Sequence, residues 1–177
     1  MKKLTLLLAF VILLALLAVA AQQPDSASSR RTFRAKLTGY EEVPSISSPG
    51  WGSFRARLTD GGTMLDYTLT YDDLQNVMAA HIHFAQKGVN GGVSAFLCGG
   101  GDKPACPMEG GTVTGTIDAA DVVGPAVQGI APGELNELVA AMRAGVTYVN
   151  VHTNDMVDPP NSGPGDFPTG EIRGQVR

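Results

Sequence analysis

Apolar and polar residues alternate along much of this chain with the two-residue period of a β-strand that has one face toward solvent. The alternation is clearest over residues 33–37, 54–58 and 65–71, and Asp60-Gly61-Gly62 between the last two runs predicts a hairpin turn. Further strands are expected at residues 77–85, 93–97, 112–117, 146–153 and 171–176. The pattern therefore predicts eight strands.

One segment has helical spacing instead. Its apolar residues, at positions 135, 138, 139 and 142, follow the i, i+3, i+4, i+7 rule, with Pro132 before them and Gly145 after them. Strands with one short inserted helix predict an all-β fold, an antiparallel sandwich or flattened barrel. The connection over residues 154–170 is long and rich in proline, and such connections are usually functional or mobile.

The first residues have the features of an export signal. Lys2 and Lys3 precede an uncharged apolar run over residues 4–21, which ends in small residues suited to cleavage near Ala20 or Ala21. We expect a signal peptide over residues 1–21, a polar linker over 22–31 and one domain over 32–177. An uncleaved membrane anchor is the alternative. With cleavage, no membrane association is expected, and the mature protein is secreted or periplasmic.

Charge and cysteine content limit the possible partners of the protein and the state of its cysteines. The formal net charge is −4 and the basic residues are scattered along the chain, so the sequence gives no electrostatic support for nucleic-acid binding. The two cysteines, Cys98 and Cys106, lie in a Gly/Pro-rich stretch, and in an oxidising compartment we expect them to form a disulfide. A metal site on these two thiols is the alternative, but their spacing matches no common ligand motif.

The chain has three histidines, and all lie in two of the expected strands. His81 and His83 share one face of their strand, and His152 shares a face with Asn150 in another. The neighbouring β-branched residues face the opposite way, toward the expected core: Ile82, Val149 and Val151. If the two strands are neighbours, three imidazoles converge on the outer face of the sheet.

Two interpretations of these histidines stay open. Three imidazoles from two strands suit a mononuclear copper or zinc site, with a position left for water or a substrate. Alternatively, the imidazoles form hydrogen bonds with Asn150, Glu171 or backbone carbonyls and orient loops.

The sequence offers no persuasive catalytic residues. It contains no nucleophile elbow and no phosphate-binding loop. The adjacent pairs Glu41-Glu42 and Asp72-Asp73 would point to opposite faces of a strand, so we expect solvated edges and no acid–base dyad. An enzymatic activity is therefore not favoured.

Taken in order, several motifs together resemble the CHRD domain, first defined in the animal developmental protein chordin and found in many bacterial secreted proteins. The resemblance spans roughly residues 32–177 and rests on FRAKLTGYEEVP, DGGTMLDYTLTYDDL, AAHIHFAQKGVNGGVSAFLC, GTVTGTI, AGVTYVNVHT and GEIRGQV. It implies an extracellular β-sandwich similar to immunoglobulin or superoxide dismutase domains, and a member of the bacterial secreted type. The strand with His81 and His83 resembles the copper-ligand strand of copper–zinc superoxide dismutases. With only three histidines in the chain, however, the complete dinuclear set cannot be built.

In the last motif, Glu171 and Arg173 share one strand face, while Ile172 and Val176 face the core. Arg173 could pair with Glu171 or clamp a neighbouring loop, and Glu171 could instead accept a hydrogen bond from a ligand histidine.

Three functional hypotheses follow. The leading one is a non-catalytic extracellular binding or structural module, whose partner is an unknown extracellular protein or envelope polymer. The second is the copper or zinc site of His81, His83 and His152, with metal-handling or redox activity. The third is a polysaccharide-binding module that uses Trp51 and Tyr40, although Trp51 is more simply expected to anchor an edge of the core.

Overall fold

The computed structural model describes residues 30–177, so the predicted signal peptide and most of the predicted linker lie outside the described residues. The described part contains the eight expected strands: β1 (Thr32–Thr38), β2 (Trp51–Thr59), β3 (Met64–Asp72), β4 (Val77–Phe84), β5 (Gly92–Cys98), β6 (Gly111–Ile117), β7 (Thr147–Thr153) and β8 (Ile172–Gln175). The expected helix is α2 (Leu135–Arg143). Four short 3-10 helices complete the regular structure: η1 (Gly39–Glu41), η2 (Asp60–Gly62), η3 (Ala119–Asp121) and η4 (Ala126–Gln128).

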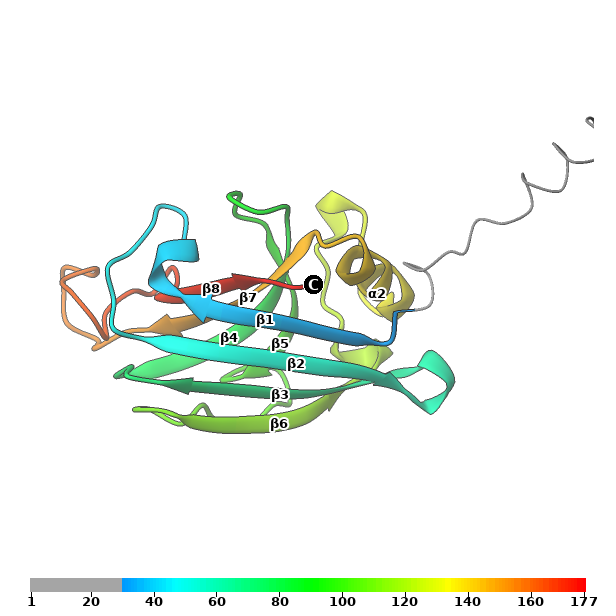
Figure 1. Ribbon diagram of the computed structural model, residues 1–177, viewed down its shortest axis with the longest axis horizontal. Coiled ribbons are helices and arrows are strands. Elements are labelled where there is room, and N and C mark those ends of the chain that lie inside the picture. The colour runs from blue at the N-terminus through cyan, green and yellow to red at the C-terminus, as the bar shows by residue number, and fades with distance from the viewer. Residues whose placement is uncertain (1–29) are drawn as a thin grey trace, which may run out of the picture.

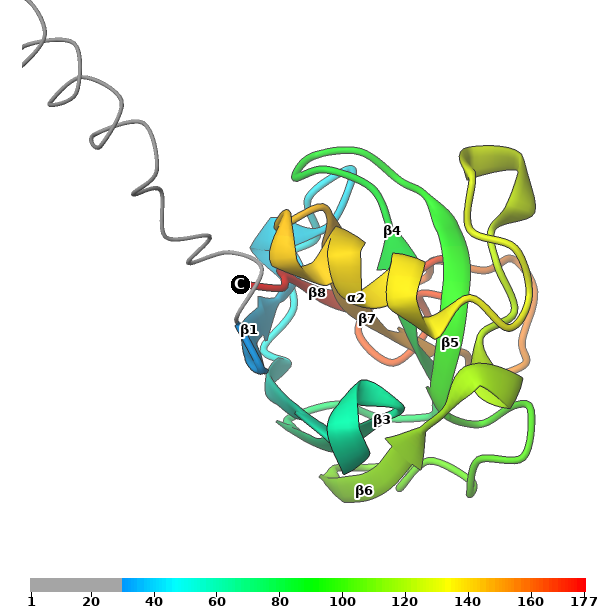
Figure 2. The ribbon, with the colours of Figure 1, turned by 90° about the vertical axis from the view of Figure 1, so that its right-hand side faces the viewer.

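All eight strands belong to one antiparallel sheet with the order β5-β4-β7-β8-β1-β2-β3-β6. The sheet curls strongly, as Figure 2 shows in a view from one end, and its outer strands β5 and β6 come into contact. The result is a near-barrel sandwich, which confirms the predicted all-β class. The predicted hairpin joins β2 to β3 through η2, where Gly61 has a φ of 68° that suits glycine.

The inside of the curled sheet holds the core. Alternation places Phe33, Leu37, Phe54 and Leu69 inside, each with no exposed surface. Helix α2 lies at one end of the curled sheet (Figures 1 and 2), and its buried face joins the same core.

The outer surface of the sheet is of two kinds. In β1, β2 and β3 every second residue is open to solvent, as expected. In β7 all seven residues are buried, because loops cover its outer side. The predicted wet face is therefore confirmed for the first three strands, whereas the outer face of β7 is covered.

The structure confirms the predicted disulfide between Cys98, at the end of β5, and Cys106 in the following loop. Within residues 30–177, no helix has the length and apolar character needed to cross a membrane.

Candidate metal centre

The three histidines lie on neighbouring strands, as the sequence-based hypothesis required. β4 pairs with β7 so that His81 lies opposite Asn150, and His152 lies two residues further along β7, opposite Ala79. Ile82, Val149 and Val151 are fully buried on the core side, so the imidazoles occupy the outer side of the sheet. Two of them are buried there, since His83 is only 8% exposed and His152 only 9%, and His81 is half-buried.

Backbone carbonyls fix the orientation of two of the three rings. Nδ1 of His83 lies 3.0 Å from the carbonyl oxygen of Gly91, and Nδ1 of His152 lies 3.0 Å from that of Pro168. A carbonyl oxygen only accepts, so in both neutral rings Nδ1 carries the proton and Nε2 presents a lone pair. This is the arrangement that protein metal sites commonly use to orient histidine ligands.

The third ring, His81, lies close to both others, with centroid distances of 4.7 Å to His152 and 5.4 Å to His83. Its Nδ1 lies 3.0 Å from Nε2 of His152, and its ring contacts the ring of Phe96 edge-on at a centroid distance of 4.6 Å. With His152 protonated on Nδ1, the proton between these two nitrogens belongs to His81. Nε2 of His81 and Nε2 of His83 are both buried without a hydrogen-bond partner among the described residues. Buried polar atoms without a partner are uncommon in folded proteins.

The ligand atoms of the three histidines lie within 4.8 Å of one another. Two nitrogens bound to one zinc ion at 2.0–2.1 Å can be at most about 4.2 Å apart. The separation of 3.0 Å between His81 and His152 already falls within this limit. A single ion therefore requires only a small movement of imidazole rings, on the order of 1 Å.

Burial keeps the three imidazoles neutral. Desolvation, followed by the influence of His152 and His83, lowers the pKa of His81 to about 3. Desolvation also lowers the pKa of His83 to about 4, although the hydrogen bond to Gly91 opposes the shift. The pKa of His152 is lowered for the same main reason. Neutral rings keep the lone pairs that a metal ion needs.

Tyr148 and Arg173 form a wall beside His83. The ring of Tyr148 is stacked on His83 with a centroid distance of 4.7 Å, and Cζ of Arg173 lies 3.4 Å from the centre of the Tyr148 ring. Arg173 donates through Nη1 to Oδ1 of Asn90 and through Nη2 to the carbonyl oxygen of Val89. Arg173 therefore clamps the loop that carries Gly91, which is one of the two roles predicted for it. It does not pair with Glu171, which was the other.

A buried carboxyl group lies next to this wall. Asn150 donates from Nδ2 to Oε1 of Glu42 at 2.8 Å, so its amide holds the loop after β1 and not an imidazole. Burial raises the pKa of Glu42 to about 7, while nearby Arg173 opposes the shift. The expectation that Glu41 and Glu42 are both solvated is wrong for Glu42, which is 6% exposed; Glu41 forms an exposed ion pair with Lys87.

Glu171 organises loops and contacts no histidine. Its Oε1 accepts from Ser48, and its Oε2 accepts from Oγ1 of Thr153 and from the backbone N–H of Gly165. These bonds attach the long connection over residues 154–170, which also supplies Pro168, to the sheet. Neither predicted role of Glu171, as a partner of Arg173 or as an acceptor for a ligand histidine, is observed among these contacts.

Several contributors to the site were not predicted from the sequence. Glu42, Tyr148, Gly91 and Pro168 all touch the site or its immediate neighbours. Tyr148 could have been noticed, because it lies on the same face of β7 as Asn150 and His152. The loop residues could not, because their positions depend on how three loops fold over the sheet.

Comparison with known proteins gives one result at the level of the family. No curated protein and no solved structure matches the chain. A family model described as CHRD domain matches residues 33–176, nearly the whole of the predicted domain. This match does not distinguish the bacterial secreted type, which stays a prediction. The chain belongs to the CHRD domain family.

Proposed function

We propose that this chain is an exported, non-catalytic binding module that holds one copper or zinc ion between His81, His83 and His152. Family membership and the disulfide between Cys98 and Cys106 support an extracellular location. The metal is proposed as a bound ion and not as a catalyst.

One observation carries the proposal: Nε2 of His83 is buried in the histidine cluster without any hydrogen-bond partner among residues 30–177. Leaving such atoms unpaired costs about 1–3 kcal/mol each. A metal ion bound by the cluster would take up the lone pair of this nitrogen. The donor set, three neutral imidazoles, suits copper and zinc better than calcium or magnesium.

The surroundings support the same conclusion. The carbonyl oxygens of Gly91 and Pro168 hold two rings in the tautomer that presents Nε2. Binding an ion requires His81 to present Nδ1 as well, so its proton moves to Nε2 or leaves. Stacking on Tyr148 limits rotation of His83. These residues therefore orient ligands and keep bulk water out, and the fourth position is left for water or a partner's side chain.

The test is the metal content of the purified mature chain. After removal of metal with a chelator, loading with copper or zinc and dialysis, we expect about one ion per chain for the native protein. We expect His83→Gln to retain much less. Tyr148→Phe is the matched control, because it keeps the ring stacked on His83 and all three histidines, and removes only the hydroxyl group that contacts the backbone of Gly91.

Thermal unfolding of the same proteins separates loss of binding from loss of fold. A ligand that binds only the folded state stabilises it according to its concentration over its dissociation constant. The midpoint should therefore rise with added metal in the native protein and in Tyr148→Phe, but not in a folded His83→Gln. Equal metal content in native protein and His83→Gln would reject the site and leave the histidines as hydrogen-bonding supports for loops.

A further inference from the structure

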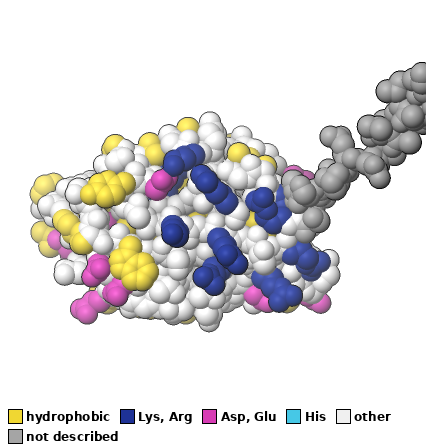
Figure 3. Space-filling model, in the orientation of Figure 1, with side chains coloured by type: hydrophobic (Ala, Val, Ile, Leu, Met, Phe, Trp, Pro, Cys, Tyr) yellow, Lys and Arg dark blue, Asp and Glu magenta, His cyan; other side chains and the backbone are white. Residues whose placement is uncertain are grey.

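A second feature lies on the outer side of β1 and β2, away from the histidines. There the surface is hollowed into a groove of 510 Å³ lined by residues of β1, β2, β8 and the adjoining loops. Five of the lining side chains are cationic: Arg34, Lys36, Arg55, Lys87 and Arg177. Figure 3 shows the basic side chains gathered over these strands, although they are scattered along the sequence.

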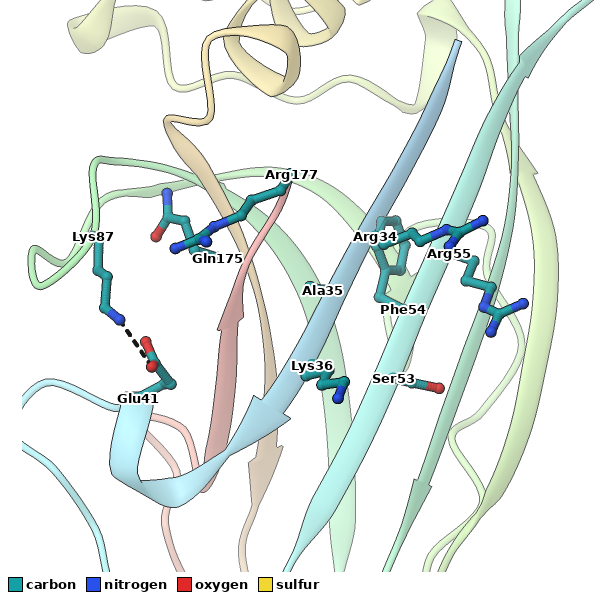
Figure 4. Close-up of a pocket in the computed structure, with 10 residues that line it drawn as sticks. All are labelled: Arg34, Ala35, Lys36, Glu41, Ser53, Phe54, Arg55, Lys87, Gln175 and Arg177. Atoms are coloured by element: carbon teal, nitrogen blue, oxygen red, sulfur yellow. Dashed lines mark hydrogen bonds and ion pairs between the residues drawn. The ribbon is translucent and has the colours of Figure 1, made fainter. Parts of the chain in front are cut away.

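The strand register explains how the charges come together. Arg34 lies directly opposite Arg55 in the β1–β2 pair. On its other side, Arg34 exchanges two backbone hydrogen bonds of 2.8 Å with Arg177. Three arginines from three neighbouring segments therefore form a row across the sheet. In Figure 4 the side chain of Arg34 extends across β2 toward Arg55.

Little negative charge offsets this row. Glu41 is the acidic side chain in the lining, and it is already paired with Lys87 at 2.9 Å, as drawn in Figure 4. No ion pair within residues 30–177 involves Arg34, Lys36 or Arg55. Like charges directly opposite each other destabilise a sheet. A surface on which Arg34 and Arg55 stay adjacent and without ion pairs to other described residues is suited to an anionic ligand.

The same face continues beyond the cations with an aromatic side chain. Trp51, Ser53, Arg55 and Arg57 alternate along β2 on its outer side, and Trp51 is 46% exposed. The expectation that Trp51 anchors an edge of the core is therefore wrong. From Trp51 to Arg57 the strand extends about 20 Å, which is long for a single small anion but suits an extended chain.

We propose that this groove binds an anionic polysaccharide, with its acidic groups on Arg34 and Arg55 and a sugar ring on Trp51. Guanidinium groups form paired hydrogen bonds with carboxylates and keep their charge at any physiological pH. An exposed indole offers an apolar face to a sugar ring while its N–H can donate to a hydroxyl group. The site is independent of the histidine cluster, which lies on other strands.

The experiment measures binding of alginate oligosaccharides, as a carboxylated probe, to the mature chain at low salt with a chelator present. We expect saturable binding that weakens as salt is added, because the charges are exposed to solvent. Neutral dextran should not bind. Arg34→Ser/Arg55→Ser should weaken binding about tenfold or more, and Trp51→Ala should weaken it at the same salt without changing its salt dependence.

Arg143→Ser/Asn136→Asp is the matched control, because it makes the same change in net charge on α2 and should bind as the native chain does. His83→Gln should also bind normally, which separates this proposal from the metal site. Absence of alginate binding at low salt, or equal weakening by the control pair, would overturn the proposal. Equally tight binding of duplex DNA or of anionic lipid vesicles would also overturn it, because it would show that the groove attracts any negatively charged ligand.

Discussion

The outer surface of this one sheet has two parts that treat polar residues in opposite ways. On the covered face, formed by β4, β7 and β8, loops bury His83, His152, Tyr148, Asn150 and Arg173, and His81 is half-buried. On the bare face, formed by β1 and β2, arginine and lysine side chains extend into solvent. Both parts follow the same strand alternation, and only the loops above them differ.

The two faces differ in what it means for a polar side chain to lack a hydrogen-bond or ion-pair partner. Water solvates the cations of the bare face, so an unpaired arginine there costs little. Under the loops a polar group needs a partner inside the protein, and one that lacks a partner is costly. Arg173 has Asn90, Val89 and the ring of Tyr148, whereas Nε2 of His81 and of His83 have none among the described residues. Buried oxygens of Thr147, Asn150 and Gln175 also lack a partner within residues 30–177, but only the histidines offer nitrogen lone pairs in a cluster, which supports the proposed site.

The largest effect should come from substituting Arg173, the buried arginine of the covered face. Arg173→Ala removes two charge-assisted hydrogen bonds and a buried stack, so we expect a loss of about 4 kcal/mol in the free energy of unfolding. Arg173→Lys should recover only part of this, because an ammonium group cannot reach both loop acceptors in the plane of the guanidinium. Urea unfolding at pH 7 measures both, and a loss below about 1 kcal/mol for Arg173→Ala would contradict the clamp.

The next effect concerns how the free energy of unfolding of the metal-free protein falls at acidic pH. The folded-state pKa of His83 is lowered from 6.5 to about 4, so its contribution is present above pH 6.5 and is lost as the pH falls through about 4. The shift corresponds to about 3 kcal/mol. His83→Gln should remove this dependence, which urea unfolding at pH 4 and pH 7 would reveal. An unchanged difference between the two pH values would show that His83 is not held neutral.

Glu42 should give a dependence of similar size and opposite sign. Its folded-state pKa is raised from 4.5 to about 7, so its contribution is present below pH 4.5 and is lost as the pH rises through about 7. Glu42→Gln resembles the protonated form, so it should be more stable than the native chain at pH 8, by up to about 3 kcal/mol. A Gln variant that is less stable at pH 8 would mean that the charged carboxylate is favoured by Arg173.

The smallest effect should come from the bare face. Arg55→Ala removes an exposed charge that lies opposite Arg34, so the free energy of unfolding should change by less than about 0.5 kcal/mol. Relief of repulsion can make the change slightly favourable. The same urea measurement serves as the counterpart of Arg173→Ala. A loss comparable to that of Arg173 would remove the distinction between the two faces.

Local patterns in the sequence predicted most of the fold. Two-residue alternation located the strands, and four apolar positions with a proline and a glycine located α2. Alternation also put His81, His83 and His152 on the side opposite Ile82, Val149 and Val151, because side-chain direction depends only on position within a strand. The nearby cysteines in their loop were sufficient for the disulfide.

What the sequence could not predict depends on contacts between distant segments. Glu42 is buried because the loop after β1 folds over β7, 108 positions away at Asn150. Pro168 reaches His152 only because Glu171 attaches the long connection to the sheet. The groove also arises from register, since Arg34, Arg55 and Arg177 become neighbours only when their strands pair. Alternation gives the face of a residue, but not what covers that face.

The most direct test of the central claim is the number of imidazoles bound to the metal in the loaded protein. X-ray absorption spectroscopy of the mature chain, loaded with zinc or copper, measures the ligand type and bond length. We predict three imidazole nitrogens, at about 2.0–2.1 Å for zinc, and no sulfur ligand. A shell made of oxygen alone, or an unchanged spectrum in His152→Gln, would contradict a metal centre on the covered face.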